Sequence, residues 1–296
     1  MYRFLLNASL AIAAALYPAA APDQDKASSQ AQSADDPIVV TGQRAIPRKE
    51  AARFVTRIST AVDGQLARFA DPVCPTVFGL PDRYAGILTA RVRQVAAAAH
   101  VPVDRQDCRP NLIIIIATDA DQLVKQMRKD IRGLFGGLRE SELKRALADG
   151  PVHVWNSVEL RNEDGQTPTG GDDGGPPTLQ VKSASIIDLS TQQAMVQSVI
   201  VIDDDAIVGK TLGQIADYVA MRTLAGTRPP GKGVPADTIL TLFDPGAVAP
   251  PGLTAIDAAF LKGLYRTRPT GRSVMQRGQI SNAIVRDARD RAKGEE

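Results

Sequence analysis

Two runs of β-branched residues restrict most strongly how this chain can fold. Residues 112–117 read LIIIIA and residues 198–203 read SVIVID. A strand with one face in water alternates apolar and polar residues, whereas a continuous β-branched run suits a strand that is buried on both faces. Such strands lie in the middle of a sheet that carries helices on each side. The two runs therefore predict an α/β fold.

The segments around these runs predict the other elements. Strands are expected at 152–160 and 178–189, as a hairpin-like pair around a polar surface loop at 163–177 that is rich in Gly and Pro. Thr254 is expected to cap one of the helices, with Asp257 in its first turn. The predicted fold class is α/β (α+β), with a mixed, partly parallel sheet packed by helices and a helical C-terminus. Helices are expected over 48–62, 81–100, 119–130, 140–149, 210–226, 236–243, 254–265 and 278–296.

Residues 1–21 have the composition of a secretory signal peptide. Arg3 precedes an apolar stretch from Phe4 to Tyr17, and the residues 19–21 are the small ones that a signal peptidase accepts. The alternative is an amphipathic or buried N-terminal helix. The stretch is too short and too rich in Ala for a stable membrane span, so no integral membrane segment is expected after signal cleavage. The prediction is a periplasmic or secreted protein.

The rest of the chain is expected to form three parts. Residues 22–47 are rich in Ala, Ser, Gln, Asp and Pro without periodicity, which is typical of a disordered linker. Residues 48–270 are expected to form a single α/β domain that includes the flexible loop 163–177. Residues 271–296 are expected to form a charged C-terminal helix.

Cys74 and Cys108 are the only two cysteines of the chain. In an oxidising compartment, an even pair of this kind is expected to form a disulfide. The alternative is a redox or metal pair, which needs a close spacing such as C-x-x-C, and that spacing is absent.

The overall composition excludes some function classes. The chain has 35 Lys and Arg against 33 Asp and Glu, and 4% aromatic residues. A nucleic-acid partner is not expected, because such proteins concentrate positive charge or offer aromatic stacking platforms. No complete catalytic or metal motif is present, so neither a cofactor nor a metal is expected.

Several short patterns invite a ligand-binding interpretation that the spacing does not support. Gly209-Lys210-Thr211 resembles the end of a phosphate loop, but the Gly required five residues before Gly209 is replaced by Asp204. The triplet Asp203–Asp205 offers oxygen ligands for a hard cation without the alternating spacing of a calcium loop, so capping is favoured. Asp172-Asp173 lies in the predicted loop and is interpreted as solvated acid.

The two histidines, His100 and His153, are also weak candidates. Counting residues does not exclude a Ser-His-Asp triad. However, there is no G-x-S-x-G motif, and neither His is close in sequence to a marked Ser or Cys. Structural roles are favoured for both.

A resemblance to known proteins appears in residues 198–273. This part contains the helix LGQIADYVAMRTLAG, the short segment TILTLF and then LTAIDAAFLKGLYRTRPTGRS. It resembles the C-terminal half of exported bacterial proteins with a zincin-like, metalloprotease-type domain. The whole chain also resembles an uncharacterised family of exported α-proteobacterial proteins through DPVCP, residues 108–117, LGQIADYVAMRTLA and LTAIDAAFLKGLY.

The zincin resemblance implies a site from which the zinc motif has been lost. A working zincin helix carries two His at i and i+4 and a Glu, which together hold Zn²⁺ and handle the proton of its water. The matching helix here has Gln214, Asp217, Tyr218 and Met221 on one side, and no His follows His153.

Two functions remain open from the sequence. The first is a non-catalytic periplasmic scaffold that binds a peptide or a cell-envelope protein partner, for instance along an edge strand near the Gly-rich loop. The alternative is a hydrolase with an atypical site of Asp217, Tyr218 and an acid from Asp203–Asp205. That enzyme would require these groups to converge on a pocket, whereas Gln214 and Asp217 in a packed helix would favour the scaffold.

Overall fold

The structure is a computed structural model that describes residues 46–171, 175–182, 188–231, 233 and 237–294. The predicted signal peptide lies outside the described residues, and so does the predicted linker except for Ile46 and Pro47. Asp172 and Asp173 of the predicted loop lie outside them as well.

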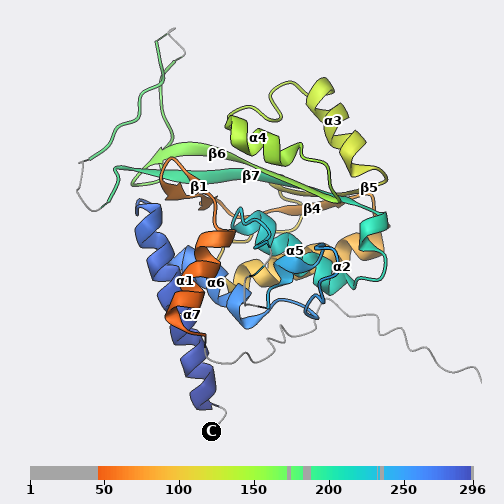
Figure 1. The fold of residues 1–296 in the computed structure, drawn as a ribbon. Coiled ribbons are helices and arrows are strands. Elements are labelled where there is room, and N and C mark those ends of the chain that lie inside the picture. Colours follow the sequence, from red (N-terminus) through yellow and green to blue (C-terminus); the bar gives the residue numbers. More distant parts are fainter. Residues whose placement is uncertain (1–45, 172–174, 183–187, 232, 234–236, 295–296) are drawn as a thin grey trace, which may run out of the picture. The chain divides into compact units, whose positions relative to one another are not determined.

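A five-stranded sheet organises the described residues (Figure 1). β7 (Thr191–Asp203) pairs in parallel with β3 (Arg68–Phe69) and β5 (Leu112–Ala117), and β5 pairs in parallel with β4 (Pro75–Phe78). β6 (Val152–Asn162) is antiparallel to β7 and lies along nearly its whole length. β3 and β5 therefore pair with one edge of β7, and β6 pairs with the opposite edge. Within the described residues β6 pairs with no other strand, so it lies at an edge of the sheet. The predicted mixed, partly parallel sheet is confirmed.

Helices cover both faces of this sheet. α3 (Ala120–Asp130) and α4 (Glu140–Ala146) lie on one face, above the sheet in Figure 1. α2 (Asp82–Ala98) and α5 (Leu212–Leu224) lie on the other face. Three further helices lie on the same side as α2 and α5: α1 (Arg48–Ile58), α6 (Ala255–Arg266) and α7 (Ser273–Gly294). Within the described residues, no helix combines the length and the apolar character needed to cross a bilayer.

The apolar core consists of one cluster on each face of the sheet. Ile114 and Ile200 belong to the larger cluster, which includes residues of α2 and α5. Val199 and Val201 belong to the smaller cluster, together with Trp155 and residues of α3 and α4. Because successive side chains of a strand point to opposite faces, β7 contributes to both clusters. The prediction that the β-branched run 198–203 is buried on both faces is confirmed.

The strand predicted at 178–189 is not found at its described residues, 178–182 and 188–189, and residues 183–187 lie outside the described part of the chain. Its described residues form no strand, and only Thr178 and Asp188 make isolated bridges. The partner of β6 is β7, which begins at Thr191 and includes the predicted strand 198–203. The first residues of β7 are polar, so no apolar pattern in the sequence indicates a strand there. In the structure, Gln192 is nevertheless buried, and its Nε2 donates to the carbonyl of Asn162 at 2.9 Å.

Several predicted helices differ in extent from the structure. The helix predicted at 48–62 ends at Ile58, and Ala61 and Val62 lie in a short strand; the helix predicted at 140–149 ends at Ala146. The described residues of 236–243 form only a 3-10 turn, η2 (Ile239–Thr241), because the Thr238 hydroxyl and the Asp257 carboxylate hold its first backbone N–H groups. α7 begins at Ser273 rather than Gly278, and Ser273 N donates to the carbonyl of Gly64 at 2.6 Å.

The shortest elements were not predicted from the sequence. They are β3, β4, η1 (Asp205–Ile207) and the two-stranded hairpin of β1 (Ala61–Val62) and β2 (Gln65–Leu66). Two to four residues are too few for a hydrophobic period to be recognised.

Candidate functional site

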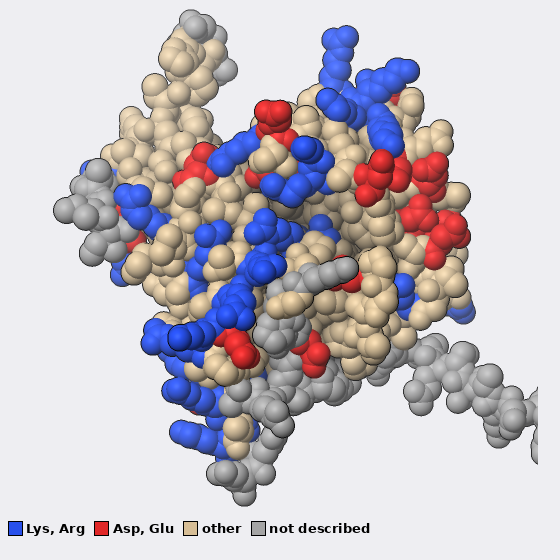
Figure 2. Space-filling model, viewed as in Figure 1, with Lys and Arg blue, Asp and Glu red and all other residues tan. Residues whose placement is uncertain are grey.

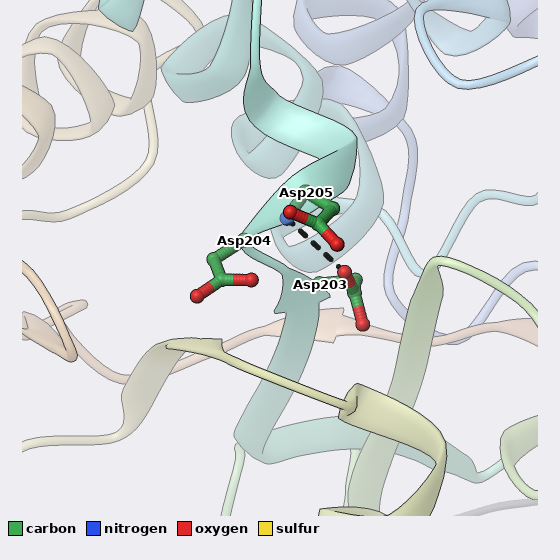
Figure 3. A group of neighbouring side chains, drawn as sticks. All are labelled: Asp203, Asp204 and Asp205. Atoms are coloured by element: carbon green, nitrogen blue, oxygen red, sulfur yellow. Dashed lines mark hydrogen bonds between the residues drawn. The ribbon is translucent and has the colours of Figure 1, made fainter.

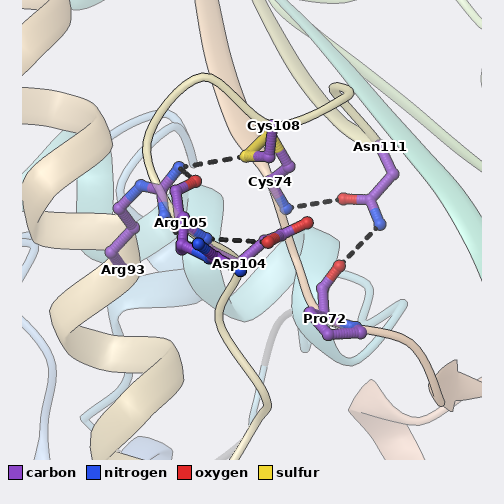
Figure 4. Close-up of a disulfide and its surroundings, with 7 residues drawn as sticks. All are labelled: Pro72, Cys74, Arg93, Asp104, Arg105, Cys108 and Asn111. Carbon is purple, nitrogen blue, oxygen red and sulfur yellow. Dashed lines mark hydrogen bonds between the residues drawn. A yellow bond between two sulfur atoms is a disulfide. The ribbon is translucent and has the colours of Figure 1, made fainter.

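The predicted disulfide is present in the structure. Cys74 Sγ and Cys108 Sγ are 2.00 Å apart, and they join the residue before β4 to the loop before β5 (Figure 4). Asn111 supports the same turn, because its Oδ1 accepts from Cys74 N at 2.7 Å and its Nδ2 donates to Pro72 O at 3.0 Å. The bond therefore ties together the N-terminal ends of two neighbouring parallel strands.

Asp217, the first candidate catalytic residue, is held by an ion pair. Its side chain is 1% exposed, and Arg91 Nε lies 2.8 Å from its Oδ1. Its Oδ2 accepts from Arg91 Nη2 at 3.0 Å and from Leu253 N at 2.6 Å. Both oxygens of this carboxylate thus have protein partners.

Gln214 and Tyr218 also have structural partners. Gln214 Oε1 accepts from Thr211 N at 3.0 Å in a capping box at the start of α5, and its Nε2 donates to Pro250 O at 2.9 Å. The Tyr218 hydroxyl accepts a hydrogen bond from Arg222 Nη1. Burial raises the pKa of Tyr218, and the nearby charge of Arg222 only partly opposes this, so the phenol stays neutral.

The acidic triplet Asp203–Asp205 lies at the end of β7, and the Asp203 carboxylate accepts from neighbouring backbone N–H groups (Figure 3). Asp203 Oδ2 accepts from Ala120 N at the start of α3, and its Oδ1 accepts from Asp205 N, both at 3.1 Å. Asp204 Oδ2 accepts from the Thr118 hydroxyl at 2.6 Å. The three residues each offer an oxygen within 4.8 Å of the others, which could hold a hard cation. However, both oxygens of Asp203 are already engaged, so capping accounts for this residue.

Both histidines have local partners. His100 follows α2 with a φ of 62°, and Arg266 Nη2 lies 3.4 Å from its Nε2. His153 is buried on β6, where its Nδ1 lies 2.9 Å from the carbonyl of Ala146 and its Nε2 lies 3.0 Å from Asp121 Oδ1. Because Ala146 ends α4, the Nδ1 contact ties the edge strand to that helix, whereas Nε2 lies near Asp121 of α3 but has no hydrogen-bond partner within the described residues.

The Gly209-Lys210-Thr211 pattern is accounted for without a nucleotide. Thr211 caps α5, and Lys210 Nζ lies 5.3 Å from the ring centroid of Phe243.

The feature that the sequence did not predict is a pocket of about 110 Å³ beside β6. It is lined by residues of α4 on one side of the sheet and by residues at the end of α5 on the other, so it lies at the edge of the sheet, next to β6. Val62 of the β1–β2 hairpin also lines it. We call this cavity the β6 pocket; its lining includes Val154, Asn156, Glu142, Arg145, Arg222 and Arg228.

The β6 pocket has a basic lining. Arg145, Arg222 and Arg228 contribute three guanidinium groups to it, against the single carboxylate of Glu142 among the described residues. On the face of the molecule drawn in Figure 2, Lys and Arg side chains extend from the centre toward α1 and α7, and several Asp and Glu side chains gather at the right. None of Gln214, Asp217 and Tyr218 lines the β6 pocket.

The fold and the β6 pocket define a disulfide-bonded, mixed α/β protein with an antiparallel edge strand beside a basic cavity. Searches of protein-family models, curated proteins and solved structures found no match to the chain. Its function is therefore inferred from its own residues.

Proposed function

We propose that this protein is a non-catalytic protein of the periplasm, or secreted, that binds an extended peptide segment of a cell-envelope partner along β6. The α/β unit serves as a degenerate zincin-like scaffold, in which the sheet and the helix α5 persist without a zinc site. Recognition of the partner then depends on strand pairing and on side-chain contacts in the β6 pocket.

One observation carries this proposal: the long edge strand β6 has a pocket beside it. β6 has 11 residues and, within the described part of the chain, pairs only with β7. An edge strand presents unpaired N–H and C=O groups to which a further strand can add. The alternate residues Val152, Val154, Asn156 and Val158 all line the β6 pocket, so an added strand would find a cavity beside its own side chains.

The alternative of a hydrolase is not favoured by the geometry. That enzyme needs Asp217, Tyr218 and an acid of Asp203–Asp205 around one reacting atom. Asp217 is instead paired with Arg91 between two helices, and Asp203 caps the start of α3. These residues have structural partners that account for their positions.

The disulfide supports the proposed export. Disulfides persist in oxidising compartments and are rare in the cytosol. We expect the mature protein, purified from the periplasm of an expressing bacterium, to begin at Pro22 when its N-terminus is sequenced. An intact Met1 on the exported form would contradict the predicted cleavage.

Selection of peptides against the full chain tests the binding role. A phage-displayed library of extended peptides is selected on the immobilised protein, and the selected peptides are then added during amide hydrogen exchange. We expect the amides of β6 to exchange more slowly, while those of β4, another edge strand of the sheet, stay unchanged. Selected peptides that protect β4 or α7 instead, or a library that yields no binder, would refute the role of β6.

A further inference from the structure

The β6 pocket contains positive charge that its own residues do not neutralise. Within the described residues, none of Arg145, Arg222 and Arg228 forms an ion pair. The carboxylate of Glu142, which shares the lining, accepts from Arg139 N at 3.0 Å as part of the cap of α4. The pocket is therefore short of negative charge.

The excess of positive charge matters most at Arg222, because this residue is only 9% exposed. Its Nε donates to Thr227 O at 2.9 Å and its Nη1 donates to the Tyr218 hydroxyl, and both acceptors are neutral. Arg222 acts on Asp244 only as a charge: burial raises the pKa of Asp244, and Arg222 opposes that rise. A guanidinium removed from water is stabilised best by a carboxylate in direct contact, and this contact is missing.

Trp155 supplies a buried N–H donor that has no acceptor within the described residues. It lines the β6 pocket, it is 2% exposed, and its Nε1 has no hydrogen-bond partner within the described residues. Buried indole N–H groups are normally paired, because leaving one unpaired forfeits its hydrogen bond to water. The lining of the β6 pocket therefore includes a buried cation without a carboxylate partner, and it is this cation that an anion in the pocket would neutralise.

We infer that the β6 pocket binds the side-chain carboxylate of an acidic residue in an extended peptide that pairs with β6. This inference rests on the proposed peptide-binding role of β6. A cavity of about 110 Å³ has room for a small side chain. Two parallel hydrogen bonds from a guanidinium fit a carboxylate well, so an Asp or Glu of the peptide can satisfy Arg222 or its neighbours.

An exposed ion pair lies at the rim of the β6 pocket, and it does not prevent such a peptide from binding. Asp63 follows the lining residue Val62, Arg139 follows the lining residue Leu138, and the two form an ion pair across the rim. Their side chains are 69% and 44% exposed. Exposed ion pairs contribute little to stability and are screened by salt, so this pair can open.

The single tryptophan of the chain makes the pocket directly observable. The full chain is titrated with a short peptide of alternating Val and Glu, acetylated at its N-terminus and amidated at its C-terminus, while the Trp155 emission is followed. The same peptide with Gln, or with Lys, in place of Glu serves as the comparison. We expect the Glu peptide to shift the emission and to bind roughly tenfold more tightly than the Gln peptide, with an affinity that falls as salt rises.

Two variants on α4 localise the effect. Arg145 lines the β6 pocket, whereas its neighbour Lys144 does not, and both are exposed. Arg145→Ala is expected to weaken binding of the Glu peptide about fivefold or more, while Lys144→Ala, with the same loss of charge, leaves it unchanged. Arg228→Ala provides a second lining variant that is expected to behave as Arg145→Ala.

The outcomes separate this inference from the proposed function. If the Gln peptide binds as tightly as the Glu peptide, or if Lys144→Ala weakens binding as much as Arg145→Ala, carboxylate recognition in the pocket is refuted while strand addition stands. If no extended peptide binds the protein, both the inference and the proposed function are refuted.

Discussion

Arg91 of α2 and Asp217 of α5 form a two-point ion pair inside the protein. Arg91 Nε lies 2.8 Å from Asp217 Oδ1, and Arg91 Nη2 lies 3.0 Å from Oδ2. Oδ2 also accepts from the backbone N–H of Leu253, which immediately precedes the cap of α6. A residue that the sequence places among the catalytic candidates therefore connects three segments of the fold.

The variant Asp217→Ala tests this structural role. It leaves the partly buried charge of Arg91 without its partner and Leu253 N without an acceptor, so we expect the free energy of unfolding to fall by about 3–5 kcal/mol. Urea unfolding followed by circular dichroism measures it. The control is the double variant Arg91→Met with Asp217→Leu, which removes both charges and should cost clearly less. A single variant as stable as the parent would contradict the role.

Removal of the disulfide should destabilise the protein because it raises the conformational entropy of the unfolded chain. The bond closes a loop with a sequence separation of 34 residues. By the chain-entropy relation, a loop of this length is worth about 3–4 kcal/mol. The double variant Cys74→Ala with Cys108→Ala is expected to lose this amount in thermal or urea unfolding. Reductant should destabilise the parent protein and leave the double variant unaffected; equal sensitivity in both would argue against the assignment.

Stability should decrease with rising pH in a window set by Asp257. Burial raises the pKa of Asp257 to about 6, against the opposing hydrogen bonds from Ile239 N and from Thr238 and Thr254. In the unfolded chain its pKa is about 3.9. The folded state therefore binds this proton more tightly, and its contribution, ~3 kcal/mol, is fully present below pH of about 3.9 and lost as pH rises through about 6.

Asp257→Asn isolates that contribution because asparagine does not titrate. We expect the parent to lose ~2 kcal/mol more than the variant between pH 4 and pH 7, measured by urea unfolding at each pH. Other groups titrate in both proteins and cancel in the comparison. Parallel pH profiles for the two proteins would show that Asp257 does not titrate in this range.

Asp203 should stabilise the fold by capping rather than by holding a metal. Asp203→Ala leaves Ala120 N and Asp205 N without their acceptor, and we expect a loss of about 1 kcal/mol, as for other capping residues. Chelator should change neither protein. Stoichiometric metal in elemental analysis of protein purified without chelator, lost in Asp203→Ala, would instead establish a cation site.

The features that were predicted correctly depend on residues close together in the sequence. The run 112–117 is apolar throughout and contains four consecutive Ile residues, and β5 occupies those residues. Thr254 caps α6 by accepting from Asp257 N, three residues along the helix. Capping groups and hydrophobic periods act over one or two turns, so a short window contains all the information they need.

The strand β7 shows where local patterns fail. Its start, TQQ, looks polar, yet Gln192 and Gln193 are buried, and the carbonyl of Asn162 in β6 accepts a hydrogen bond from the Gln192 side chain. The tendency of a residue to be in a strand depends on what the strand pairs with and what covers it.

In the candidate site, too, features with a local sequence pattern were predicted, whereas contacts between distant residues were not. The amino-acid sequence established the strand 152–160, the helix that carries Asp217 and the cysteine pair, since each has a recognisable local pattern. Folding determined that Asp217 is paired with Arg91, 126 residues away, and that Arg145 and Arg222 line one cavity beside β6. Contacts between distant residues depend on how helices pack on the sheet, and packing is a property of the whole chain.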